Sequence, residues 1–434
     1  MRIGIKIVLF IILFFNGIHL VFPEKNLYPR RIRPIDKKSI NQELENHLSD
    51  FQYSDYIDGA ANRFLRRWEL KGLSMSVVKD GKLVFAKGYG LADAETNLPV
   101  TPAHLFRMAS VSKLITAIAI MKLVDENKLS LDSYVFGEAG IFNEPEYLSY
   151  KDKRIGKIKI RHLLSHSGGW SQRYGDPAFH PLDIARKVGD ENPATPDTYL
   201  KFVVSRRLHF TPGTRKSYSN MGYVILGKVI EKVSEMPYEE YVNFKILYPL
   251  GIYDMHLGKS LLDDRRENEV KYYEQKGSPM VLSSYGSGEY VAKSYGGNNI
   301  ELLGAAGGWI GSSVELSKLL VAVDGFESVK DVLPGDLIKE MVDPREGWGP
   351  YGWMATTNNG YWWRTGSMAG TSAMSKRMPD GTIWVVLINT SSWKGSKFPK
   401  EINYLMQKIN SRIKQWPERN LFEYANHHEI LALN

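Results

Sequence analysis

The sequence predicts an α+β fold in which one sheet is built from both ends of the chain and a helical lobe is inserted between them. A hairpin pattern lies at residues 73–86, helical patterns recur between residues 114 and 247, and strand patterns return at 360–364 and 382–389. Because strands bury their apolar faces by sharing one core, these distant strands are expected to meet in a single sheet.

The first predicted elements are a hairpin and a buried helix. Apolar runs at residues 73–78 and 83–86 flank Asp80-Gly81, a dipeptide typical of hairpin turns. Residues 114–124 are apolar on nearly every side, which indicates a helix buried in the core.

The helical lobe and the second half of the sheet follow. Residues 223–233 and 238–247 show helical patterns within a region rich in Pro and Gly loops. The apolar run at 382–389 indicates a strand that is buried on both faces, and a terminal helix is predicted at about residues 399–414.

Composition and charge exclude several classes of protein. Of the 434 residues, 43% are hydrophobic and 24% are charged, which excludes a disordered or a polytopic membrane protein. The net charge is +8, but residues 1–40 hold eight basic and two acidic side chains, so we expect no basic face for nucleic acid on the body. The lack of cysteine excludes disulfides, thiolate metal sites and a cysteine nucleophile.

The N-terminal residues are predicted to direct export. Arg2 and Lys6 precede an apolar run at residues 7–22, as in secretory signals, and this run is short for a membrane span of about 20 residues. No clean cleavage site follows, so residues 1–23 are either a cleaved signal peptide or a retained membrane anchor. In both cases we expect a periplasmic or secreted body, with residues 24–50 as a polar tether.

Ser110 and Lys113 stand at the start of the predicted buried helix. At a spacing of three residues they share one helical face, with Cβ atoms about 5–6 Å apart. Burial lowers the pKa of a lysine that lacks an anionic partner, and a neutral lysine can take the proton of a serine nucleophile. An isolated S-x-x-K pattern is more often an N-cap serine followed by an exposed lysine.

Two further short patterns follow in the same order. Tyr218 and Asn220 come after a Thr-Pro-Gly turn; a tyrosine near a lysine can act as acid or base, and an asparagine amide can bind a substrate amide. Arg364, Thr365 and Gly366 end a predicted strand, where the arginine can bind a carboxylate and the glycine lets a substrate lie against the strand edge.

Taken together, S-x-x-K, Y-x-N and basic-Thr-Gly resemble the serine β-lactamase and penicillin-binding-protein superfamily. The resemblance is to its class C β-lactamase-like branch, which includes DD-peptidases, D-aminopeptidases and carboxylesterases, and it covers about residues 55–410. Supporting segments lie at residues 106–113, 163–169, 212–223, 248–251 and 306–308.

The resemblance implies a β-lactamase/transpeptidase-like fold with an antiparallel sheet flanked by helices. The hydrolase domain would span residues 51–415, with the sheet from about 51–110 and 290–415, the helical lobe from about 111–290, and a C-terminal tail at 416–434.

The resemblance also implies residue roles. Ser110 would be the acylated nucleophile, Lys113 its partner base, and Tyr218 the group that shuttles the proton and activates water. Asn220 would hold the substrate amide, and the backbone N–H groups of Ser110 and Ser367 would form the oxyanion hole.

The sequence departs from the family pattern at Arg364, where the family usually has lysine or histidine. Arginine does not give up its proton at ordinary pH, but it binds a carboxylate with two N–H groups. We therefore expect Arg364, with Thr365 and Gly366, to bind substrate rather than to transfer a proton.

Other signals carry less weight. His162 and His166 have zinc-like spacing, but no glutamate follows His162 and no third ligand is evident, so we expect no metal and no cofactor. We interpret His166 as a structural turn residue.

A G-x-S-x-G elbow is absent from the sequence, which argues against an α/β-hydrolase triad. Among the aromatic residues, Trp170 is expected to line a substrate pocket.

Two functional hypotheses follow. The first is an exported serine hydrolase that forms an acyl-enzyme on Ser110 with an ester, a D-amino-acid peptide or a β-lactam, which the motifs do not rank. The second is a penicillin-binding sensor or scaffold with little turnover, against which the intact Ser110, Lys113, Tyr218 and Asn220 argue. The sequence does not specify an oligomeric state.

Overall fold

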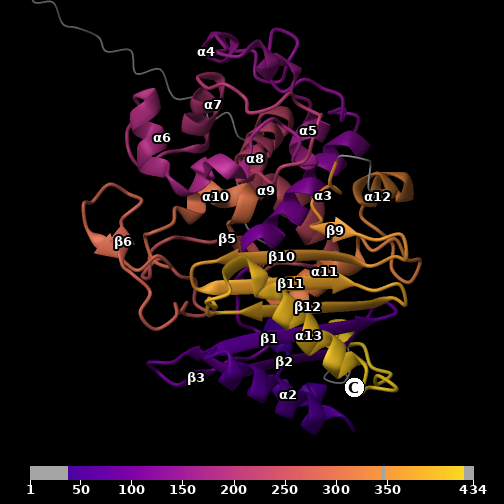
Figure 1. Ribbon diagram of the computed structural model, residues 1–434. Coiled ribbons are helices and arrows are strands. Elements are labelled where there is room, and N and C mark those ends of the chain that lie inside the picture. Colours follow the sequence, from indigo (N-terminus) through magenta and orange to yellow (C-terminus); the bar gives the residue numbers. More distant parts are fainter. Residues whose placement is uncertain (1–37, 344–347, 425–434) are drawn as a thin grey trace, which may run out of the picture. The chain divides into compact units, whose positions relative to one another are not determined.

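The computed structural model describes residues 38–343 and 348–424 (Figure 1). The predicted signal or anchor at residues 1–23 lies outside the described residues, as does most of the predicted tether. Across the described ranges, no helix combines the length and the apolar character that crossing a membrane requires.

The described strands are β1 Gly72–Lys79, β2 Lys82–Asp93, β3 Leu98–Pro99, β4 Phe106–Arg107, β5 His256–Leu257, β6 Val281–Leu282, β7 Tyr290–Val291, β8 Trp309–Gly311, β9 Ala355–Thr356, β10 Trp362–Met368, β11 Thr371–Arg377 and β12 Thr382–Ile388. The described helices are α1 Ile40–Glu43, α2 Ser54–Arg67, α3 Ser112–Asp125, α4 Pro145–Leu148, α5 Ile160–Leu164, α6 Pro181–Val188, α7 Pro196–Val204, α8 Asn220–Ser234, α9 Tyr238–Val242, α10 Ile300–Gly307, α11 Ser313–Val321, α12 Gly335–Val342 and α13 Pro399–Asn410.

One antiparallel sheet joins the two ends of the body. In the described part of the chain it has seven strands in the order β3-β2-β1-β12-β11-β10-β9. β1 forms the predicted hairpin with β2 and pairs on its other edge with β12, with Leu73 opposite Ile388. The structure therefore confirms an α+β fold with one sheet from distant segments.

Helices cover both faces of this sheet (Figure 1). β12 is buried along its whole length, and its side chains alternate between two cores. Trp384, Val386 and Ile388 pack in the core that includes α2 and α13, whereas Val385 and Leu387 pack in the core that includes α11 and the helical lobe. A strand buried on both faces has no polar side to show, which explains its uninterrupted apolar sequence.

The helical lobe surrounds α3. Every residue of α3 from Ser112 to Met121 is buried, so the structure confirms the predicted core helix. The helical pattern at 238–247 is divided between α9 and a π-helical turn, Asn243–Leu247.

Segments at both ends of the body pack more closely than a tether and a tail would. Ile40 and Leu44, from the end of the predicted tether, are buried. In the predicted tail, Leu421 is buried and Trp416 stacks on Phe51 at a ring-centre distance of 5.7 Å. The packed body thus includes residues on both sides of the boundaries predicted at 51 and 415.

A pair of substitutions in α13 tests this packing. Ile402 is fully buried, so Ile402→Ala should lower the free energy of unfolding by about 2–5 kcal/mol. Tyr404 on the same helix is 62% exposed, and Tyr404→Ala should change that free energy by about 0.5 kcal/mol or less. Urea unfolding followed by circular dichroism measures both; similar losses in the two variants would contradict the assigned face of α13.

Candidate active site

Ser110 and Lys113 are brought together where a short turn leads into α3. Ser110 lies in the 3-10 turn Ala109–Val111, and α3 starts at Ser112. Lys113 Nζ lies 3.3 Å from Ser110 Oγ, and the lysine side chain is fully buried. The spacing in the sequence thus predicted a contact that the structure contains.

Two further acceptors hold the Lys113 amine. Nζ donates to Asn220 Oδ1 at 2.6 Å and to the Ala306 carbonyl at 2.5 Å. Ala306 lies in the last turn of α10, where helix carbonyls lack intrahelical partners and are free to accept. Burial lowers the pKa of Lys113 and the charge of Arg364 lowers it further, against the opposing influence of Tyr218 and Asp176.

Tyr218 approaches Ser110 from the loop before α8. Its hydroxyl donates to Ser110 Oγ at 2.8 Å and accepts from Arg364 Nη2 at 2.9 Å. Burial raises the pKa of Tyr218, but the positive charges of Lys113 and Arg364 outweigh burial and lower the pKa to about 8. The tyrosine can therefore ionise near neutral pH, which an acid–base group needs.

Arg364 positions the nucleophile and the tyrosine. Its side chain is fully buried, with Nε donating to the Ser110 carbonyl at 2.6 Å and Nη2 to Tyr218. Nη1 is also buried and has no hydrogen-bond partner among the described residues. Carboxylate binding by Arg364 stays a prediction. The structure adds its contacts with the Ser110 carbonyl and with the Tyr218 hydroxyl, which the sequence did not reveal.

The remaining residues of the basic-Thr-Gly pattern lie on β10 but differ in what they face. A Cβ at Gly366 would lie 2.2 Å from the Met108 carbonyl oxygen, so glycine is required there for close approach of the backbone before Ser110. Thr365 points to the other side of the strand and lines a cavity near α13, together with Tyr404. Ser367 stands opposite Ser372 in β11.

The nucleophile is preceded by a strained residue. Ala109 has a φ of 46°, a left-handed conformation that is uncommon for residues other than glycine. Such conformations persist only where the surrounding structure imposes them, and they concentrate at functional sites. Ala109 is buried between the Gly366 strand and Ser110, which is consistent with such a site.

Sequence reasoning missed the contacts of His166 and Asp176. The His166 ring packs on Tyr218 at 4.4 Å between ring centres, and its Nδ1 accepts from the Ser219 N–H at 3.2 Å. Burial, Arg364 and Lys113 lower the pKa of His166 well below its ordinary range, so the ring is neutral. Asp176 accepts from Asn220 Nδ2 at 2.7 Å. Asp176 also caps the short turn Pro177–Phe179, and this local role was the only one that its sequence context could indicate.

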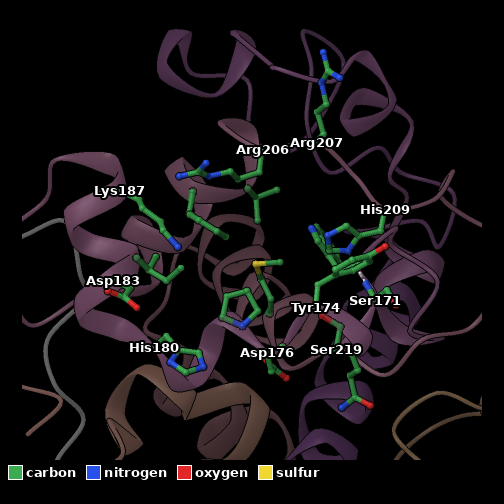
Figure 2. Close-up of a pocket in the computed structure, with 18 of the residues that line it drawn as sticks. Ser171, Tyr174, Asp176, His180, Asp183, Lys187, Arg206, Arg207, His209 and Ser219 are labelled. Atoms are coloured by element: carbon green, nitrogen blue, oxygen red, sulfur yellow. Dashed lines mark hydrogen bonds between the residues drawn. The ribbon is translucent and has the colours of Figure 1, made fainter. Parts of the chain in front are cut away.

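A cavity of about 350 Å³ opens beside this cluster, within the helical lobe (Figure 2). Tyr218 and Asp176 belong to its wall, and so does Trp170, the aromatic residue expected to line a pocket. Among the described residues, no group of three or more His, Cys, Asp or Glu side chains is placed to hold a metal ion.

Replacing Arg364 tests the electrostatic part of this arrangement. Arg364→Gln removes a positive charge beside Tyr218, so the pKa of Tyr218 should rise above about 8. The tyrosinate absorbance that disappears in Tyr218→Phe reports this ionisation. Arg364→Lys, which keeps a charge, should give a smaller rise than Arg364→Gln. An unchanged midpoint in folded Arg364→Gln would contradict the assigned effect.

Comparison with known proteins identifies the family of this chain. The sequence profile described as Beta-lactamase matches residues 60–405. Protein flp of Staphylococcus aureus is 28% identical over 229 residues, 52% of this chain and 42% of flp. Esterase EstB of Burkholderia gladioli is 30% identical over 202 residues, 46% of this chain and 50% of the esterase. The chain thus matches about half the length of these curated relatives.

Solved structures show the same fold. An octameric penicillin-binding protein homologue from Pyrococcus abyssi aligns with a TM-score of 0.61 and 26% identity, covering 85% of this chain and 78% of that one. The D-amino acid amidase of Ochrobactrum anthropi SV3 aligns with a TM-score of 0.64 and 20% identity, covering 84% and 100%. With the profile match across most of its length, the chain belongs to the beta-lactamase family.

Proposed function

We propose that this protein is a serine hydrolase that works through an acyl-enzyme on Ser110. The observation that carries the proposal is the convergence on Ser110 Oγ of Lys113 Nζ at 3.3 Å and the Tyr218 hydroxyl at 2.8 Å. A serine hydroxyl is a weak nucleophile until an adjacent base takes its proton, and both neighbours have a lowered pKa. Family membership supports the same chemistry.

In the proposed reaction, Ser110 Oγ attacks the substrate carbonyl carbon while its proton passes to Lys113 or to ionised Tyr218. The backbone N–H groups of Ser110 and Ser367 stabilise the resulting oxyanion. The tetrahedral intermediate then expels the leaving group, which departs with the proton, and the acyl group stays on Ser110. Water activated by Tyr218 attacks the acyl-enzyme, which releases the acid and restores the serine.

The proposed substrates are esters, amides or peptides of D-amino acids, and β-lactams. All present a carbonyl to the same nucleophile and oxyanion hole. The esterase among the relatives and the D-amino acid amidase among the structures of the same fold support the first two classes. Asn220, held by Lys113 and Asp176, is proposed to orient the substrate amide.

We also propose that the protein acts outside the cytoplasm. The support comes from the sequence, where basic residues precede the apolar run at residues 7–22.

Ser110→Ala tests the nucleophile. Hydrolysis of p-nitrophenyl butyrate should fall by about a thousandfold or more, because the acyl-enzyme can no longer form. Ser287→Ala, which removes an exposed hydroxyl that belongs neither to this cluster nor to the cavity wall, should keep the wild-type rate. Turnover by folded Ser110→Ala at the wild-type rate would refute the mechanism.

The pH profile tests Tyr218. In this scheme ionised Tyr218 takes or relays the serine proton together with Lys113, and the ionised form predominates above its pKa, so kcat/KM for p-nitrophenyl butyrate should rise with pH through a midpoint of about 8. Activity should be lost as the pH falls below that midpoint. Tyr218→Phe should lose both the activity and the inflection, and a wild-type profile that is flat across this range would contradict the role of Tyr218.

A further inference from the structure

The cavity beside Tyr218 has an apolar floor and a cationic wall. Ile184 from α6, Val203 from α7 and Met221 from α8 line it, and all three are almost completely buried. Lys187 on α6 and Arg206 just after α7 line it as well, and Figure 2 shows their side chains approaching the cavity from two sides. The cavity therefore combines apolar and cationic side chains, and the two cations come from separate elements of the lobe.

Within the described residues, the cavity lining carries three positive side chains, Lys187, Arg206 and Arg207, against the carboxylates of Asp176 and Asp183. Lys187 and Arg206 have no ion-pair partner there, although Asp176 and Asp183 also line the cavity. Asp183 pairs with Arg186, and Asp176 accepts from Asn220 and from the Ala178 N–H. Asp183 is thus paired with Arg186, whereas Asp176 bonds to uncharged N–H groups at the end of the cavity next to the catalytic cluster.

Arg206 has an unused donor. Its Nε is buried and lacks a hydrogen-bond partner in the described part of the chain, while its guanidinium lies 5.2 Å from the ring centre of Phe202. Because Nε is closed to solvent, a ligand in the cavity would meet the terminal Nη groups of Arg206 rather than Nε. Arginine is well suited to an anionic oxygen, which it binds through N–H groups in a planar fork.

The cavity adjoins the catalytic cluster. Tyr218, which contacts the nucleophile, lies in its wall, and so does Asp176, which holds the Asn220 amide. A substrate whose acyl amide or chain passes Asn220 would extend into this space. Lys187 and Arg206 would then meet the far end of the acyl group rather than the leaving group.

We infer that this cavity binds the acyl part of the substrate and selects acyl chains that carry a carboxylate at their far end. The inference rests on the proposed hydrolase function and names its substrate class: esters or amides of acids with a second, anionic terminus. The apolar floor takes the chain, and Lys187 and Arg206 take the carboxylate.

Two esters that differ only at the chain end test the inference. Mono-p-nitrophenyl adipate ends in a carboxylate where p-nitrophenyl hexanoate ends in a methyl group. In wild type at low salt, kcat/KM for the adipate ester should exceed that for the hexanoate by about tenfold or more. Combining Lys187→Gln with Arg206→Gln should bring this ratio close to one, and added salt should lower it in wild type.

Lys153→Gln is the matched control, because it removes an exposed positive charge from the same lobe at a position outside the cavity wall. It should keep both the ratio and the activity. Equal kcat/KM for the two esters in wild type, or a preference that survives in the double variant, would overturn the inference.

Binding measured without turnover separates this inference from the proposed function. Titration calorimetry with Ser110→Ala should show that the free adipate anion binds more tightly than the free hexanoate anion. Adding Lys187→Gln and Arg206→Gln to this variant should abolish the difference in affinity. Adipate binding with no hydrolysis by wild type of either ester, of a D-amino acid amide or of a penicillin would support the cavity and refute the hydrolase. Hydrolysis of both esters with no preferential binding of adipate would refute the cavity and leave the hydrolase intact.

Discussion

The burial of Lys113 is the constraint on which the rest of the site depends. An ammonium removed from water must be held by hydrogen bonds or lose its proton, since an unpaired buried charge is costly. The described structure meets this requirement with acceptors from separate segments: Ser110 before α3, Asn220 at the start of α8, and Ala306 at the end of α10. The helices of the lobe are thereby fixed around the amine that the nucleophile needs.

The neighbouring strand adds a second, permanent cation. Arg364 on β10 contacts both the Ser110 carbonyl and the Tyr218 hydroxyl, so the sheet is tied to the lobe through the reacting groups. Because arginine keeps its proton, proton transfer is left to Lys113 and Tyr218, while Arg364 favours the ionised tyrosine. The neutral His166 ring packs on Tyr218 without adding charge, and so constrains the position of the tyrosine.

Much of this arrangement was predictable from the sequence, because its signals are local. Asp80-Gly81 marked the hairpin, the unbroken apolar run marked β12, and the helical spacing of Ser110 and Lys113 marked their contact. The family resemblance added Tyr218 and Asn220, whose separation along the chain gives no geometric information by itself.

The rest depended on contacts between distant segments. The Asp176–Asn220 bond joins residues whose local sequence looks like an ordinary turn cap and a helix start. The direction of the Thr365 side chain follows from the alternation of side chains along β10. The sequence predicted that Thr365 lies at the end of this strand, whereas the strand continues to Met368. The cationic wall of the cavity combines α6 with the residue after α7, and no sequence pattern links Lys187 to Arg206.

The central claim is that Ser110 becomes acylated during turnover, and direct detection of the adduct tests it most closely. The protein would be mixed with p-nitrophenyl acetate, quenched with acid before steady state, digested and analysed by mass spectrometry. The account predicts an acetyl group on the peptide that carries Ser110, at the Ser110 side chain. Release of p-nitrophenol with no acetylated peptide, or with the acetyl group confined to another residue, would contradict it.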